Sequence, residues 1–199
     1  MKLTTYNILM LINAICWAIT YILIIKANFS YKKCVMPTFS LATNIIWEVI
    51  FSFIYPHQVP QIYFDYIWLT LDVIIFMQLL FFNQINKRNL LLLLFFSFIF
   101  IVLCVYNGDK WGIYSALITN LIMSILFILE IIKSRSEGHS LAIGLTKMLG
   151  TAIACIAFYF YIPQMQNLFI IGMFIAILIF DIIYCMILAK YIKISNFIF

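Results

Sequence analysis

Three carboxylates stand inside long apolar stretches of this 199-residue sequence: Glu48, Asp72 and Asp181. Glu48 is the one acid in "MPTFSLATNIIWEVIFSFIYPH". A carboxylate at the centre of a bilayer costs about 2.5–3.5 kcal/mol, so such residues usually face a bundle interior or a cavity. An unpaired acid in low dielectric is expected to keep its proton near neutral pH. Such an acid in a dry pocket can protonate a bound substrate.

The composition decides which elements must position these acids. Hydrophobic residues make up 66% of the chain and charged residues 10%, which is typical of polytopic membrane proteins. A spanning helix needs about 20 mostly apolar residues. We therefore expect an all-α, single transmembrane domain over residues 1–199, without a cleavable signal peptide. Its seven helices are predicted at residues 4–25, 35–55, 63–84, 89–106, 111–132, 140–161 and 168–190.

The distribution of Lys and Arg predicts the orientation. Nine of the 12 basic residues fall between segments 1 and 2, 3 and 4, or 5 and 6, or after segment 7. Basic residues concentrate in cytoplasmic loops, so we expect the N-terminus outside and the C-terminus in the cytoplasm. The net charge of +5 is then a topology signal, and no nucleic-acid partner is expected. The predicted location is an integral, multi-pass membrane position, in the cell membrane of a bacterium or the endoplasmic reticulum of a eukaryote.

Other catalytic chemistries lack their motifs. The five cysteines have no ligand spacing and are expected to be small core residues. His57 and His139 are predicted at opposite membrane faces, which argues against a shared metal site. The sequence has no HExxH, Gly-rich phosphate loop or Ser-His-Asp order. We expect no metal and no cofactor.

The predicted depths favour one pocket for the three acids. At a helical rise of about 1.5 Å per residue, Glu48, Asp72 and Asp181 lie roughly 10, 14 and 20 Å below the outer boundary. Glu48 and Asp181 have no evident basic neighbour at their depth, whereas Asp72 is either a pocket residue or a helix-packing contact. Glu130 and Lys147, nearer the cytoplasm, are expected to form a structural ion pair.

Neighbouring side chains complete the candidate site. Asn44 shares a helix face with Glu48, Trp68 shares one with Asp72, and Tyr184 follows Asp181 by three residues. Asn44 is expected to orient the Glu48 carboxyl, and Tyr184 to hydrogen-bond Asp181. Aromatic faces can stabilise a developing cation, although most of the aromatic rings are expected to pack or to face lipid. The candidate substrate-binding residues are Asn44, Trp47, Trp68, Asp72, Asn120 and Tyr184.

Three segments resemble the integral-membrane terpene cyclases of meroterpenoid and indole-diterpene pathways. "MPTFSLATNIIWEVIFSFIYP" is similar to the family pattern MP…N-x-x-WE…YP, "KSRSEGHSLAIGLTKMLGT" to R-G-x-S…[KR]-x-LG, and "IFDIIYCMILAKYIK" to its last helix. The resemblance implies that Glu48 and Asp181 are the catalytic residues. Glu137 replaces a basic residue of the family pattern, and Asp72 stands where some relatives have Asn, so the resemblance leaves open which acid donates the first proton.

The resemblance also implies the reaction. We expect an enzyme of isomerase or lyase type that cyclises a polyprenyl or prenylated substrate, plain or epoxidised, by protonation and without loss of diphosphate. The sequence has no DDxxD-type cluster for magnesium and diphosphate. Glu48 would donate the proton, and Asp181 would assist this step or the final proton loss. The substrate is expected to be a lipophilic small molecule that enters laterally from the bilayer.

Two other classes of function stay open at this stage. The Pro-Gln pairs in "VPQIYFD" and "IPQMQN" resemble those of PQ-loop transporters, which are also small seven-helix proteins. Both pairs, however, are predicted at helix ends or in loops. In a receptor-like or structural membrane protein, the buried acids would merely specify helix packing. The oligomeric state is not predicted.

Overall fold

The computed structural model describes residues 4–82, 84–134 and 136–198, with side chains described through Tyr191. Within these ranges the chain forms helices and no strand, as predicted. The helices are α1 (Thr5–Tyr31), α2 (Thr38–Val49), the π-helix η1 (Ile50–Ile54), α3 (Gln61–Phe81), α4 (Lys87–Tyr106), α5 (Ile113–Ser134), α6 (Leu141–Tyr161), the short 3-10 helix η2 (Pro163–Met165) and α7 (Leu168–Ile198). The seven predicted helices are therefore confirmed.

Six of these helices are long and apolar enough to cross a membrane. The exception is the second helix, which is shorter: α2 and the π-helix η1 together extend only from Thr38 to Ile54. The first and last helices are longer than predicted, ending at Tyr31 and Ile198. The prediction ended both segments at lysines. Lysine stems can lie along a helix while their ammonium groups reach water, so these charges do not end the helices.

Local sequence explains several helix ends. The side chains of Thr4, Asn86 and Ser140 accept hydrogen bonds from backbone N–H groups of the first turns of α1, α4 and α6. Such caps satisfy donors that have no partner within the helix. At its other end, α1 stops where Lys32 takes a left-handed conformation with φ 52°.

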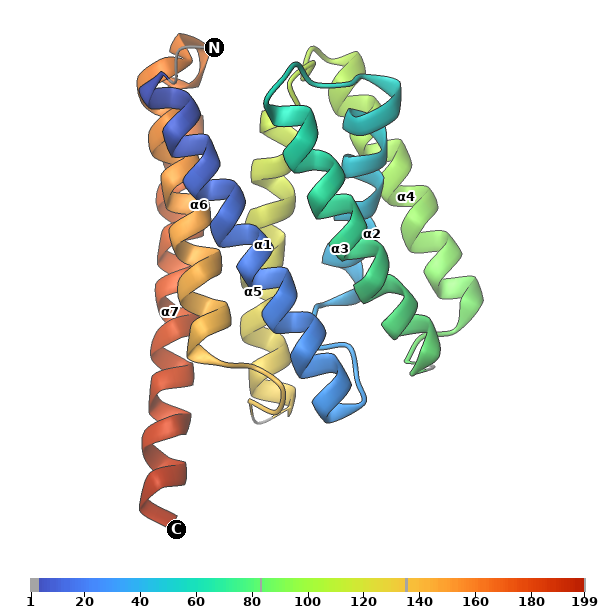
Figure 1. Ribbon diagram of the computed structural model, residues 1–199, viewed down its shortest axis with the longest axis vertical. Coiled ribbons are helices and arrows are strands. Elements are labelled where there is room, and N and C mark those ends of the chain that lie inside the picture. Colours follow the sequence, from blue (N-terminus) through green and yellow to red (C-terminus); the bar gives the residue numbers. More distant parts are fainter. Residues whose placement is uncertain (1–3, 83, 135, 199) are drawn as a thin grey trace.

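The helices form one bundle in which α5 lies between two groups (Figure 1). Helix α1 packs against α6 and α3, helix α5 against α7 and α2, and α4 against α2. The two termini lie at opposite ends of the bundle (Figure 1). Below, the N-terminal end means the end that holds the starts of α1, α3 and α5. This end is the predicted outer face.

The outside of the bundle suits contact with lipid. Large apolar side chains are exposed on every long helix, among them Phe81, Tyr106 and Leu168, each at least 79% exposed. Inside, a cluster that includes Tyr21, Leu79 and Phe127 packs in the other half of the bundle. The N-terminal half is less completely filled and contains the cavity described next.

Candidate active site

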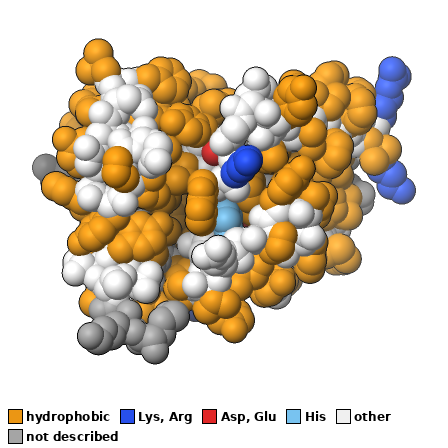
Figure 2. Space-filling view, turned by 90° about the horizontal axis from the view of Figure 1, so that it is seen from above, with side chains coloured by type: hydrophobic (Ala, Val, Ile, Leu, Met, Phe, Trp, Pro, Cys, Tyr) orange, Lys and Arg blue, Asp and Glu red, His pale blue; other side chains and the backbone are white. Residues whose placement is uncertain are grey.

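A cavity of about 330 Å³ opens inside the N-terminal half of the bundle. Helices α1, α2, α3, α5 and α6 all contribute walls, together with the segment between η1 and α3. Large apolar side chains, including Trp17, Trp47 and Trp68, make up most of the surface. Seen from the N-terminal end, the molecule is mainly hydrophobic, with a histidine side chain visible near the centre (Figure 2). An apolar cavity with few polar groups is typical of a small-molecule site.

Glu48 is the acid in the cavity wall. Its residue is 2% exposed, and its Oε2 atom has no hydrogen-bond partner. The carboxyl of Asp72 lies next to it from α3, fully buried, and neither Asp72 oxygen accepts a hydrogen bond from a donor. Tyr21 and Asn44 lie beside Asp72, and the Asn44 amide donates a 2.9 Å hydrogen bond to the Tyr21 hydroxyl. Two carboxyl groups thus meet without a counter-charge.

The local sequence of the second helix holds Glu48 in place. Trp47 donates its indole N–H to the Gly112 carbonyl at 3.0 Å and to Ser115 Oγ at 3.2 Å, which ties α2 to α5. Gly112 has φ +61°, and a Cβ atom there would lie 2.6–2.8 Å from the rings of Phe51 and Trp47. Glycine is therefore needed at this close approach. The π-helix η1 begins two residues after Glu48, at Ile50, and such helices are frequent at functional sites.

Polar atoms without partners cluster around the same cavity. Besides Glu48 Oε2, they are Asn13 Oδ1 on α1 and Thr119 Oγ1 and Asn120 Oδ1 on α5. The Asn120 amide is oriented by its 3.0 Å hydrogen bond to Thr151 Oγ on α6. Buried polar groups are nearly always hydrogen-bonded. These atoms therefore suit a cavity whose occupants carry polar groups.

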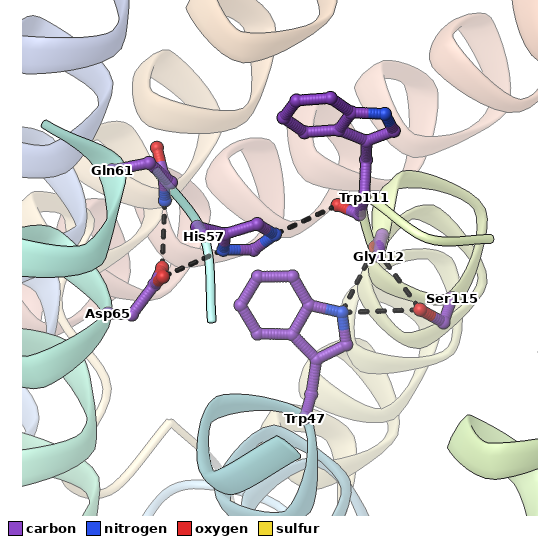
Figure 3. A network of polar contacts seen from close by, with 7 residues as sticks. All are labelled: Trp47, His57, Gln61, Asp65, Trp111, Gly112 and Ser115. Carbon is purple, nitrogen blue, oxygen red and sulfur yellow. Dashed lines mark hydrogen bonds and ion pairs between the residues drawn. The ribbon is translucent and has the colours of Figure 1, made fainter. Parts of the chain in front are cut away.

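A second polar cluster lies at the N-terminal mouth of the cavity (Figure 3). His57 Nδ1 lies 2.7 Å from Asp65 Oδ2, and His57 Nε2 lies 3.3 Å from the Trp111 carbonyl oxygen. Gln61 donates to the other Asp65 oxygen at 2.8 Å, and Asp65 is fully buried. The His57 ring stacks on Phe51, with centroids 4.9 Å apart and planes 3° apart. His57 and Gln61 line the cavity, so this cluster forms part of its wall.

Asp181 has a different environment from the one predicted. Lys147 Nζ lies 2.6 Å from Asp181 Oδ1 and donates at 2.7 Å to Ser124 Oγ. Both charged residues are at most 2% exposed. The predicted Glu130–Lys147 pair is therefore wrong, and so is the expectation that Asp181 lacks a basic neighbour. The membrane depths predicted from the sequence placed Lys147 beside Glu130, but packing of α6 on α7 brings Lys147 to Asp181 instead.

Two predicted hydrogen bonds are also replaced. The Tyr184 hydroxyl pairs with His139 Nδ1 at 3.0 Å rather than with Asp181. Asn44 donates to Tyr21 rather than to Glu48. In both cases a helix neighbour on the same face was available, but a residue on another element offered the better approach.

The structure thus divides the predicted site residues into two groups. Asn44, Trp47, Glu48, Trp68 and Asn120 line the cavity. Asp72 lies behind Glu48 and touches it without lining the cavity. Asp181 and Tyr184 lie outside the cavity, and Asp181 instead contributes to a separate apolar cavity of about 260 Å³ formed by residues of α6 and α7.

Sequence reasoning missed the cluster at the mouth and two polar residues of α1, Asn13 and Tyr21. One signal was present: Asp65 precedes Asp72 by seven residues, two helical turns, so the two acids share a face of α3. Asp65 was overlooked because it lies near the predicted start of its helix, where an acid needs no special account. In the described parts of the chain, no three His, Cys, Asp or Glu side chains converge on a metal position.

Comparison with known proteins identifies the family. Residues 2–194 match the family model of Pyr4-like transmembrane terpene cyclases, and the chain belongs to this family. It is 37% identical to the terpene cyclase macJ of Penicillium terrestre over 70 residues, 35% of this chain and 27% of that protein. It is 26% identical to the Pyr4-family terpene cyclase mfmH of Annulohypoxylon moriforme over 169 residues, 75% of this chain and 68% of that protein. No solved structure matches the chain.

The family match confirms the resemblance that the sequence motifs indicated. It gives no support to the alternative of a PQ-loop transporter. In the structure, Pro60 immediately precedes α3 and Pro163 begins η2, so neither Pro-Gln pair lies within a long helix.

Proposed function

We propose that this protein is a membrane-embedded terpene cyclase that starts cyclisation by protonating its substrate from Glu48. The observation that carries the proposal is the position of Glu48, which lines an apolar cavity while it is 2% exposed and its Oε2 atom has no hydrogen-bond partner; Asp72 lies behind it. Two carboxyl groups that share a buried site cannot both ionise easily, so one proton is retained between them. A positioned acid of this kind contributes roughly 10²–10⁴-fold to a reaction rate.

The proposed steps balance without a cofactor. The Glu48 carboxyl gives its proton to a terminal alkene carbon or to an epoxide oxygen of the prenyl chain, and the resulting cation is attacked by the next double bond. The final cation loses a proton from a neighbouring carbon, forms an alkene and returns the proton to the Glu48–Asp72 pair. The product has the substrate's mass and fewer double bonds. No diphosphate leaves.

The cavity wall suits a cationic intermediate. Trp17, Trp47 and Trp68 line the space next to Glu48. Aromatic faces attract cations, by about 2 kcal/mol or more where water is excluded. Exclusion of water would also protect the cation from capture.

For Asp181 we propose a positioning role. Its carboxylate holds Lys147, whose ammonium lies 5.9 Å from the centre of the Trp17 ring in the cavity wall. Asp181 would thus fix the α6–α7 packing behind this wall, while Glu48 supplies the proton. The motif resemblance that names both acids is compatible with this division of roles.

The substrate is proposed to be a lipophilic prenylated molecule that arrives from the bilayer. The second cavity, formed by residues of α6 and α7, shares Thr151 and Cys155 with the main cavity, so a thin wall separates the two. The proposed route leads from the bilayer through the second cavity into the main one. Ala152 lines the second cavity, so Ala152→Trp would narrow this route and should lower the uptake of a membrane-dissolved substrate. Unchanged uptake at limiting substrate would eliminate the route.

The test is product formation by wild type and Glu48→Gln in membranes of a prenyl-producing host. Gln keeps the size and polarity of Glu48 but has no proton to donate. We expect a cyclised isomer, identified by mass spectrometry and NMR, from wild type only, with both proteins accumulating equally. If the Glu48→Gln protein still forms the isomer at the wild-type rate, Glu48 is not the acid. If folded wild type cyclises neither plain nor epoxidised prenyl substrates, the cyclase proposal fails.

A further inference from the structure

Resting on the proposed cyclase function, we propose that His57 and Gln58 form a head-group subsite at the N-terminal mouth of the cavity. This subsite donates hydrogen bonds to an oxygen atom of the substrate, such as that of a phenol or a carbonyl. The substrate then binds with its oxygenated head at the mouth and its prenyl chain toward Glu48. The proposal assigns a task to side chains that the proton-transfer step leaves unused.

The partners of His57 fix its hydrogen-bonding character. Nδ1 faces the Asp65 carboxyl at 2.7 Å, and Nε2 faces the Trp111 carbonyl oxygen at 3.3 Å. A carbonyl oxygen only accepts hydrogen bonds, so the Trp111 contact is a hydrogen bond when Nε2 carries the hydrogen, and Nε2 is then a donor at the edge of the cavity.

The donor is held rigidly but incompletely used. Gln61 anchors Asp65 at 2.8 Å, and Phe51 and Trp47 pack on the imidazole at centroid distances of 4.9 and 5.7 Å. The Nε2 contact with the Trp111 carbonyl is long for an N–H···O bond, which is typically 2.9–3.0 Å. A substrate oxygen in the cavity can therefore share this hydrogen or take it over. Figure 3 shows the imidazole held between Asp65 and Trp111 above the Trp47 ring.

The residues that support the subsite and the acid, Asp65 and Asp72, lie at different depths along α3. Asp65 and Asp72 lie seven residues apart on α3, which corresponds to about 10 Å at the rise of an α-helix. Asp65 holds the donor at the mouth, and Asp72 touches the acid deeper in the bundle. An amphiphilic ligand whose oxygenated end stays near the membrane surface matches this order. A few placed polar groups in an apolar cavity are what fix a ligand's orientation.

Gln58 offers a test that leaves the fold of the mouth intact. Its side chain lines the cavity, whereas its contribution to α3 is a backbone carbonyl that accepts from the Ile62 N–H. Gln58→Leu removes a polar group from the mouth without touching the His57–Asp65 pair. His57→Phe keeps an aromatic ring against Phe51 and removes the donor. Tyr63→Phe, at an exposed position on α3, is the matched control.

The experiment compares two probes with the same prenyl chain, a prenylated phenol and the corresponding hydrocarbon without the phenol. We expect His57→Phe to raise KM for the phenol about 3–10-fold, because the hydrogen-bond donor to the phenol oxygen is lost. Gln58→Leu should raise it about 3–10-fold, as expected for a neutral bond. In both variants, kcat for the phenol and KM for the hydrocarbon should stay within about twofold of wild type.

A purely structural role gives a different result. If His57 only ties the mouth together, His57→Phe changes both probes equally and Gln58→Leu changes neither, and the proposal is overturned. Binding of the phenol to Glu48→Gln protein, followed by tryptophan fluorescence, separates this outcome from failure of the cyclase function. Weaker phenol binding on adding His57→Phe supports the subsite even without turnover. Equal binding overturns it.

Discussion

Two buried carboxylates that the sequence made look alike, Glu48 and Asp181, occupy opposite environments. Glu48 meets a second acid, Asp72, beside a cavity, and its Oε2 atom has no hydrogen-bond partner. Asp181 meets Lys147 at 2.6 Å from its Oδ1 atom, although its Oδ2 atom, like Glu48 Oε2, has no hydrogen-bond partner. In the proposed function, the first arrangement keeps a proton available. The second neutralises the acid with a permanent charge. Burial alone therefore does not identify a proton donor, because the sign of the nearest charge decides whether a proton is retained.

The largest effect should follow from breaking the opposite-charge pair. Lys147→Met leaves the Asp181 carboxylate buried without compensation, which typically costs about 3–5 kcal/mol. We expect a large loss of thermal stability of the purified protein in detergent. The double variant Lys147→Met with Asp181→Leu should recover most of it, since apolar replacement of a buried pair is often neutral. A double variant no more stable than the single one would mean that the pair does more than neutralise charge.

Next in size is the effect of Asp72→Asn on activity. Asn keeps the shape beside Glu48, so Glu48 can still donate its proton. A proton can, however, no longer move between two carboxyl groups. We expect a loss of about tenfold in kcat, smaller than that from Glu48→Gln, whose proton is the one transferred. Rates of product formation in proteoliposomes would measure both. Equal losses would assign the first proton to the pair rather than to Glu48, and the larger loss in Asp72→Asn would reverse the assignment.

The same-charge pair should also reveal itself in stability. Glu48→Gln removes one of two carboxyls that meet without a counter-charge, so we expect the free energy of unfolding to stay unchanged or rise by about 1 kcal/mol, as is common where active-site groups are strained. Lys147→Met, by contrast, is expected to lower the free energy of unfolding. Thermal unfolding of both variants in the same detergent makes the comparison. Equal destabilisation would show that Glu48 is a structural residue.

A third polar pair, His139 with Tyr184, has an effect that is absent at neutral pH and emerges only in acid. Burial, and secondarily the charge of Lys33, lowers the pKa of His139 from 6.5 to about 4. The folded protein thus resists protonation of a group that the unfolded chain protonates below about pH 6.5. Stability should be complete above pH 6.5 and fall as the pH drops from 6.5 toward 4. His139→Gln should reduce this slope in melting temperatures measured at intervals across the range, and an unchanged slope would assign it to other groups.

Sequence reasoning reached most of the fold because membrane segments obey a simple rule. Runs of apolar residues of membrane-spanning length gave all seven helices, and their ends differ mainly where lysines were taken as boundaries, at Tyr31 and Ile198. The motif around Asn44, Trp47 and Glu48 led to the family and to the cavity wall. The partners of the acids could not be found in the same way, since a partner on another helix depends on how the helices rotate and tilt.

The sequence by itself determined the class of protein, the positions of the helices and the identity of Glu48 as an acid in an apolar setting. These properties are local, because composition and spacing along one helix fix them. Only the tertiary structure decided that Glu48 meets Asp72, that Asp181 meets Lys147 and that His57 pairs with Asp65. Each of these contacts depends on which faces of separate elements turn toward one another. That choice results from packing the whole bundle, and no single segment encodes it.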